Sequence, residues 1–137
     1  MPLPTITTPT YELNLPSTGK KIKYRPFLVK EEKILILALE SRDQNEITNS
    51  VKDVLKKCVI TRGIKIDDLP TFDIEYLFLN IRAKSIGEDI NMIVTCPDDR
   101  ETEVDVTVYV DEIKVIKSKE HVKDITLDKD MTLRMKY

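Results

Sequence analysis

Residues 90–110 have the sequence INMIVTCPDDRETEVDVTVYV, and their alternation of apolar and polar side chains decides the fold. Every second position on both sides of a central turn is apolar, namely Ile90, Met92, Val94 and Cys96, and then Val104, Val106, Val108 and Val110. Successive side chains of a strand point to opposite faces, so this period of two predicts antiparallel strands with one apolar and one solvated face. Residues 97–100, Pro-Asp-Asp-Arg, supply the turn that joins the strands into a hairpin.

Two shorter alternations predict further hairpins toward the two ends of the chain. Residues 11–25 alternate apolar and polar side chains on both sides of the turn sequence Pro16-Ser17-Thr18-Gly19, which predicts an N-terminal β-hairpin. After a polar loop at 117–124, residues 125–127 and 131–135 are predicted to form short strands.

Between the first two hairpins, apolar residues recur at helical spacing in three segments. Residues 30–39 contain good helix formers, and their purely apolar run Ile34–Leu39 is expected to be buried. A second helix is predicted over Asp43–Cys58, with an N-cap signal at its start and one apolar face. A third helix follows, for which either Thr71 or Asp73 can serve as the N-cap.

The order of these elements predicts an α+β fold in which an N-terminal β-hairpin precedes about three helices. The antiparallel hairpins are expected to form one sheet with the helices packed on it. With 137 residues the chain has the length of a single domain, which is predicted to span residues 11–137. Residues 1–10 contain three Pro residues, which cannot donate to a sheet, so an extended N-terminal arm is expected there.

The composition excludes several kinds of chemistry and partner. Only three Gly, one His and two Cys occur, so phosphate-binding glycine loops and most zinc sites are not expected. The 22 Lys and Arg nearly balance the 24 Asp and Glu, which leaves no basic field for nucleic acid. No segment approaches the ~20 apolar residues of a membrane span, and residues 1–10 lack the pattern of a signal peptide. We therefore expect a cytoplasmic chain with reduced thiols that binds a small molecule or another protein.

The sequence contains no recognisable catalytic or metal-binding motif. His121 lies in a polar loop, where a solvated histidine is the simpler interpretation. The acidic stretch 98–105 lacks the spacing and the Gly of a calcium loop, and Cys58 and Cys96 lack the paired thiolates of a zinc site. We predict no enzymatic activity, no catalytic residue, no metal and no cofactor. The alternative is a small hydrolase or lysis-related enzyme that uses His121 and the acidic residues.

Five residues are candidates for contacting a protein partner. Tyr24, Arg25 and Phe27 are residue types that often anchor interfaces, although Tyr24 and Phe27 can equally seal the hairpin onto the first helix. Arg82 and Lys84, near the end of the third helix, are the other two candidates. Arg82 can equally stabilise the C-terminal end of that helix through the helix dipole.

Two long segments of the chain resemble a single protein family. These segments are YRPFLVKEEK at Tyr24–Lys33 and FDIEYLFLNIRAKSIGE at Phe72–Glu88. Both look like a baseplate protein of T-even-type contractile-tailed phages, which in that family is a hub or hub-assembly protein. The opening Leu3-Pro4-Thr5 segment, the Cys96-Pro97 turn and the closing strand Met131–Tyr137 agree with the family in order, so the similarity covers nearly the whole chain.

The resemblance implies a late viral protein that helps to build the central baseplate hub by binding other phage baseplate hub proteins, without enzymatic activity. It implies a place in the host cytoplasm during assembly. It leaves open whether the protein is a transient chaperone or a permanent subunit of the virion tail baseplate. Relatives continue beyond the strand that matches Met131–Tyr137, so a truncated C-terminus is expected here. An extended arm and open strand edges are compatible with protein–protein assembly.

Overall fold

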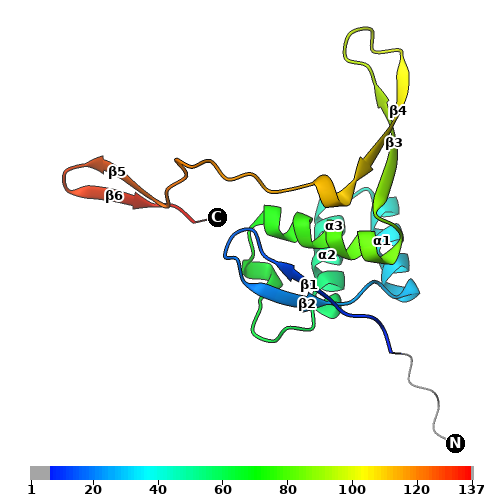
Figure 1. Ribbon diagram of the computed structural model, residues 1–137, viewed down its shortest axis with the longest axis horizontal. Helices are drawn as coiled ribbons and strands as arrows, with labels where there is room; N and C mark the ends of the chain where they lie inside the picture. The colour runs from blue at the N-terminus through cyan, green and yellow to red at the C-terminus, as the bar shows by residue number, and fades with distance from the viewer. Residues whose placement is uncertain (1–6, 137) are drawn as a thin grey trace, which may run out of the picture.

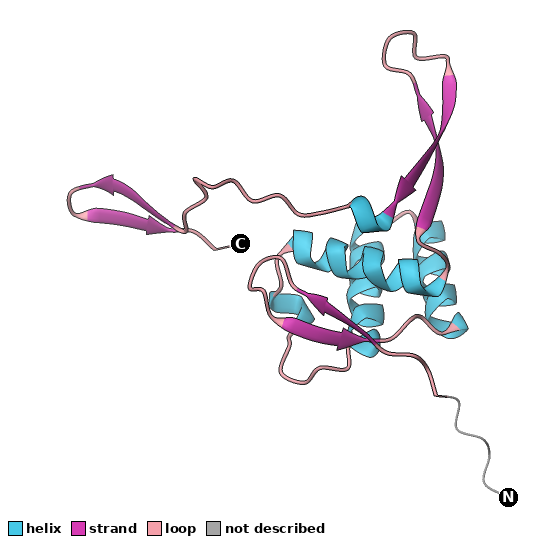
Figure 2. Cartoon of the chain, viewed as in Figure 1, coloured by secondary structure: helices cyan, strands magenta, loops and turns pink. Residues whose placement is uncertain are grey.

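The computed structural model describes residues 7–136, whose helices gather into one body (Figure 1). In chain order the elements are β1 (Tyr11–Asn14), β2 (Lys21–Tyr24), α1 (Val29–Ser41), α2 (Gln44–Cys58), the 3-10 turn η1 (Ile66–Asp68), α3 (Thr71–Ser85), β3 (Asp89–Thr95), β4 (Glu103–Tyr109), the 3-10 turn η2 (Val110–Glu112), β5 (Asp124–Asp128) and β6 (Met131–Arg134). The predicted α+β class, with an N-terminal hairpin and three helices, is confirmed. Figure 2 shows two further hairpins that project from the body, and we call β3–β4 the ribbon and β5–β6 the C-terminal hairpin.

The strands form three separate two-stranded antiparallel sheets: β1–β2, β3–β4 and β5–β6. The expectation that the hairpins join into one sheet with the helices packed on it is corrected by this topology. Alternation within a hairpin specifies the local register, but it does not specify which other hairpin lies beside it. The ribbon leaves the body after α3, and the C-terminal hairpin follows an extended connection at 113–123, so the three hairpins lie apart (Figure 1).

The core of the body lies between the β1–β2 hairpin and the helices α2 and α3. Its fully buried apolar side chains come from all three of these parts: Ile22, Val54, Leu55, Cys58, Leu77 and Ile81. The chain that follows α2 attaches to β2, because Tyr24 bridges Val59 and the Ile60 amide donates to the Lys23 carbonyl at 2.8 Å. The edge of β2 that does not pair with β1 is therefore covered.

The two long helices of the core begin in different ways. Asp43 caps α2 as predicted, since its side chain accepts a hydrogen bond of 2.8 Å from a backbone amide of the first turn. In α3 the N-cap position is held by Pro70 and not by Thr71 or Asp73. The fully buried Asp73 carboxylate instead accepts hydrogen bonds from the Ser17 amide, at 3.0 Å, and from the Ser17 hydroxyl. An acidic side chain thereby ties α3 to the turn of the first hairpin.

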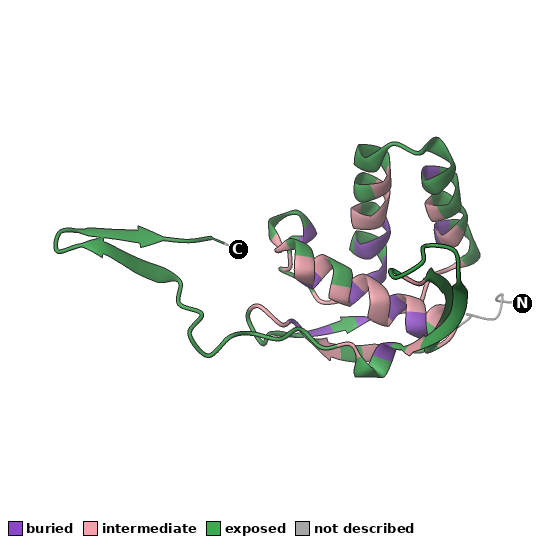
Figure 3. Ribbon diagram, turned by 90° about the horizontal axis from the view of Figure 1, so that it is seen from above, coloured by how far each residue is buried: buried purple, intermediate pink, exposed green. Residues whose placement is uncertain are grey.

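Helix α1 packs against α2 along one side and leaves much of its surface in solvent (Figure 3). The run Ile34–Leu39, expected to be buried, is largely open: Ile36 is 50% exposed and Leu39 is 62% exposed, whereas Ala38 is buried. The reason is geometric, because the run is apolar around the whole circumference of the helix while α2 covers only one side. An apolar helix surface is therefore available to a partner.

The remaining parts of the chain are peripheral to the body. Residues 7–10 of the predicted N-terminal arm are exposed and have no secondary structure, while residues 1–6 of that arm lie outside the described residues. The ribbon and the C-terminal hairpin are exposed along most of their length (Figure 3). The organisation of residues 11–137 as a single domain stays a prediction. No helix within residues 7–136 is long and apolar enough to cross a membrane.

Candidate protein-docking surfaces

The predicted contact residues at the junction of β2 and α1 are mostly covered by the body. Tyr24 is 2% exposed, and its ring lies 5.9 Å from the Tyr11 ring, measured between centroids. Phe27 is half-buried against Phe78 of α3, with 5.8 Å between the ring centroids. This packing matches the alternative interpretation, in which both aromatic side chains seal the hairpin onto the helices. A direct contact between Tyr24 and a partner would require the core to open.

Arg25 faces inward as half of a bidentate ion pair with Glu31 of α1. Its Nη1 and Nη2 atoms lie 2.9 Å and 2.7 Å from the two carboxylate oxygens. The Leu28 amide also donates to Glu31, at 2.8 Å, so the carboxylate holds the first turn of α1. The Arg25 guanidinium is the main reason that the pKa of Glu31, which is 1% exposed, falls to about 2. The same hydrogen-bonded pair raises the pKa of Arg25.

Cys58 lies beside this ion pair, with its Sγ atom 3.8 Å from a carboxylate oxygen of Glu31. Burial, followed by the neighbouring negative charge, raises the pKa of Cys58 to about 12. Because the thiolate is the nucleophilic form, this cysteine is inert at neutral pH. Cys96, at the end of the ribbon's first strand, is half-buried, and both cysteines are free.

Arg82 and Lys84 lie in the last turn of α3, near the base of the ribbon. Lys84 is paired with Glu88, which raises the pKa of Lys84, and its Nζ atom lies 5.5 Å from the centre of the Tyr11 ring. The Nη1 atom of Arg82 is buried and finds no hydrogen-bond partner within residues 7–136. The Phe27 amide donates to the hydroxyl of Ser85 at 2.8 Å. Several of the predicted residues thus gather around the C-terminal end of α3, whereas Arg25 turns toward α1.

The ribbon presents an apolar face to solvent. Its register places three cross-strand pairs on that face, namely Ile90 with Val108, Met92 with Val106 and Val94 with Val104. The pair nearest the body is half-buried, and the other four side chains are 37–45% exposed. The predicted hairpin and its period-two pattern are confirmed. The sequence pattern alone could not show that the apolar face lies away from the helices.

The C-terminal hairpin has a second open apolar face. Ile125 pairs directly with Leu133, and Met131 and Met135 lie two positions on either side of Leu133, so these four side chains share a face. All four are exposed, as is Leu127 at the irregular end of the hairpin. The short alternation of residues 131–135 was sufficient to predict the strand, but not its isolation from the body.

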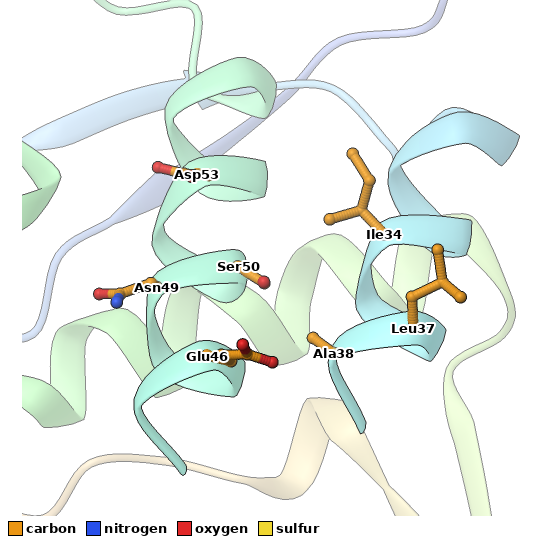
Figure 4. A pocket seen from close by; sticks show the side chains of 7 residues that line it. All are labelled: Ile34, Leu37, Ala38, Glu46, Asn49, Ser50 and Asp53. Carbon is orange, nitrogen blue, oxygen red and sulfur yellow. The ribbon is translucent and has the colours of Figure 1, made fainter. Parts of the chain in front are cut away.

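A third surface lies between α1 and α2, whose side chains line a hollow of about 380 Å³. Figure 4 shows these side chains. One wall is apolar and comes from α1; the other is polar and comes from α2. The lining residues are Ile34, Leu37 and Ala38 on the first wall and Glu46, Asn49, Ser50 and Asp53 on the second. This surface is missed when the apolar run of α1 is assigned to the core. The signal that reveals it is the length of the run, which exceeds what one neighbouring helix can cover.

The residues of the hydrolase alternative are not brought together. His121 borders a hollow of about 300 Å³, whose other lining residues are Val122, Lys123, Ile125, Met135 and Lys136. That lining contains no carboxylate, hydroxyl or thiol side chain, and the acidic residues 98–105 project away on the ribbon (Figure 1). Within residues 7–136, no group of three or more His, Cys, Asp and Glu residues could hold a metal ion.

Comparison with known families gives a match over nearly the whole chain. Residues 8–137 match the family model described as T4 bacteriophage base plate protein. No curated protein and no solved structure matches the chain. The matched range includes the body, the ribbon and the C-terminal hairpin, and it contains both segments that resemble T-even-type baseplate proteins. The chain belongs to the T4 bacteriophage base plate protein family.

Proposed function

We propose that this protein is a non-enzymatic baseplate hub assembly protein, which acts through protein–protein binding as a chaperone or as a structural component of the hub. Its family associates it with the phage tail baseplate. The observation that carries the proposal is the exposure of apolar side chains on three separate parts of the chain: the ribbon, the C-terminal hairpin and α1. Monomeric soluble proteins rarely expose large apolar patches unless these bind a partner.

The proposed partners are other phage baseplate hub proteins, which the chain meets in the host cytoplasm during assembly. The hollow between α1 and α2 indicates the chemistry of one such contact. Its apolar wall at Leu37 faces a wall from which the Glu46 carboxylate points toward α1, while the Asp53 carboxylate points away from it. This combination suits an amphipathic segment that contributes apolar side chains together with Lys or Arg.

The five residues predicted to contact partners keep a role in this proposal, but in two groups. Lys84 and Arg82 flank the base of the ribbon, where the partly exposed charge of Lys84 can contribute to the rim of an interface. Tyr24, Arg25 and Phe27 are proposed to act indirectly, by holding the first hairpin and α1 in place.

Co-purification from infected cells tests the proposed function. A tagged copy of the protein is recovered from assembly intermediates and, separately, from finished virions. Recovery with hub proteins in intermediates alone identifies a chaperone, and recovery in finished particles identifies a structural subunit. If the tagged protein is not recovered together with hub proteins in either fraction, the proposal is overturned.

Matched variants show whether the exposed face of α1 is responsible. Leu37→Gln removes an apolar side chain from the hollow, and we expect it to reduce recovery of the hub partner without lowering the melting temperature. Glu40→Gln introduces the same residue at an exposed polar position of the same helix and should leave recovery unchanged. His121→Ala should leave phage assembly intact. A defect in that variant, with the fold retained, would instead favour the hydrolase alternative.

A further inference from the structure

Helix α1 has an outer face that carries charges as well as apolar side chains. Ile36 and Leu37 lie at its centre, and Lys33 and Glu40 lie about one turn to either side. These four positions share a face because they are spaced by three, four and seven residues from the first to the last. All four side chains are exposed, whereas the buried Ala38 points toward α2 (Figure 4). We call these four residues the outer face of α1.

The two charges of the outer face have no ion-pair partner along their own helix. An ion pair on a helix surface needs opposite charges three or four residues apart. On the outer face, the residues at that distance from both Lys33 and Glu40 are Ile36 and Leu37, which are apolar. Among the residues that the structure describes, neither charge forms an ion pair with any other element. The outer face therefore presents one positive and one negative group with an apolar centre between them.

This order of charges is complementary to itself. In two antiparallel copies of α1 related by a twofold axis, a step forward along one helix is a step backward along the other. With the axis between positions 36 and 37, Ile36 faces Leu37 of the second copy, and Lys33 faces Glu40 of the second copy. The symmetry produces each pair twice. The apolar centre is then flanked by two pairs of opposite charges, about 10 Å apart along the helices.

The charges also favour this arrangement over its alternatives. A parallel pair would place Lys33 beside Lys33 and Glu40 beside Glu40, which is a repulsive arrangement. An antiparallel pair centred between positions 34 and 35 would place Lys33 opposite Ile36 and Glu40 opposite Val29, so both charges would lack a counter-charge. The last turn of α1 contains no basic residue. The antiparallel arrangement brings Lys33 of the second copy close to that end, where the helix dipole favours a cation.

We infer that the outer face of α1 binds the same face of a second copy of this chain, in a symmetric antiparallel dimer. Because both copies use the same surface, the contact closes at two chains. This inference goes beyond the proposed function, since the partner is another copy and not a hub protein. The hollow proposed for a hub protein lies on the side of α1 toward α2 and shares only Leu37 with the outer face.

Sedimentation velocity of the purified chain tests this inference directly. Between about 1 and about 300 μM, a range in which moderate interfaces dissociate, we expect the mass to rise from that of one chain toward that of two. Lys33→Glu places an acidic side chain opposite Glu40 of the second copy, and Glu40→Lys places a basic side chain opposite Lys33. Each variant alone should weaken association at least about tenfold, because two attractive pairs become two repulsive ones.

Reversing both charges tests the antiparallel register itself. The double variant Lys33→Glu/Glu40→Lys restores opposite charges in the reverse order and should associate within about threefold of the unmodified chain. An equal mixture of the two single variants should form a heterodimer, although neither associates by itself, because one chain then carries both acidic and the other both basic side chains. If neither the double variant nor the mixture recovers association, the inference is overturned.

A control variant changes the net charge by the same amount elsewhere. Arg62→Glu lies in the exposed loop that follows α2 and should associate within about threefold of the unmodified chain. Circular dichroism verifies that all variants keep their melting temperature. A chain that stays monomeric up to the highest concentration overturns the inference, and so does a dimer that Lys33→Glu fails to weaken. Either result leaves the proposed function intact wherever hub proteins still co-purify.

Discussion

Replacing Glu31 by Gln keeps the shape of the side chain but removes the charge that faces Arg25. The carboxylate is 1% exposed and accepts two hydrogen bonds from the guanidinium, so the variant leaves a mostly buried cation without its counter-charge. Lowering the pKa of Glu31 from 4.5 to about 2 corresponds to about 3 kcal/mol of folding free energy at neutral pH. Removing one partner of a buried ion pair typically costs about 3–5 kcal/mol. The two figures agree, and we expect Glu31→Gln to lower the free energy of unfolding by about 3 kcal/mol.

The effect of this substitution depends on pH in a definite direction. The pKa of Glu31 is lower in the folded than in the unfolded protein, so its ionised form stabilises the fold fully above pH 4.5. This contribution is lost as the pH falls from 4.5 through about 2. The difference between the unmodified chain and Glu31→Gln should therefore shrink to about 1 kcal/mol near pH 3.

Urea denaturation followed by circular dichroism measures this difference at pH 7 and near pH 3. A matched control is Asp67→Asn, which breaks the exposed ion pair between Asp67 and Lys56, whose charged atoms lie 2.9 Å apart. Exposed pairs contribute little to stability, so the denaturation midpoint of this variant should not move measurably. A loss below about 1 kcal/mol for Glu31→Gln at pH 7 would refute the reasoning. So would a loss of the same size at both pH values.

Three other predictions concern the body and its cysteines. Ser17→Ala removes the hydroxyl that donates to buried Asp73 and should lower the free energy of unfolding in urea by about 1–3 kcal/mol; an unchanged midpoint would contradict this. Leu55→Ala leaves a cavity in the core and should cost about 2–5 kcal/mol in the same assay, a larger loss than for any exposed apolar residue of α1. A thiol reagent at pH 8 should label Cys96 on the folded chain and should label Cys58 only after denaturation. The reason is that Cys58 is buried and its pKa is about 12. Rapid labelling of both cysteines on the folded chain would contradict the burial of Cys58.

Local patterns in the sequence were sufficient to predict the elements of the fold. The ribbon was predictable because its alternation continues through seven paired positions and depends on neighbouring strands alone. The cap at Asp43 was predictable for the same reason, since a side chain there reaches amides of its own helix turn. Asp73 could also cap its own helix, but its carboxylate accepts a hydrogen bond from Ser17 in a turn that is distant in the sequence. A local sequence pattern cannot predict such a contact.

The sites depend on tertiary arrangement and were harder to predict. Tyr24 and Arg25 are residue types that often anchor interfaces. In the structure, however, Tyr24 is buried in the body and Arg25 is paired with Glu31. The apolar run of α1 and the apolar face of the ribbon have the pattern of core elements, yet both lie in solvent. Amphipathic spacing shows that a face will be covered, but it does not show whether the cover comes from the same chain or from another.

The bond between Ser17 and Asp73 has a consequence for the order of folding. It joins positions 56 residues apart, whereas the ribbon and the C-terminal hairpin each pair strands that are close neighbours in the chain. Contacts of long sequence separation form late, because they must first close a long loop. During synthesis the body can close only once α3 has been made, and the two hairpins are then added from short-range contacts. The ribbon and the C-terminal hairpin, two of the three surfaces proposed for docking, are thus the last to emerge.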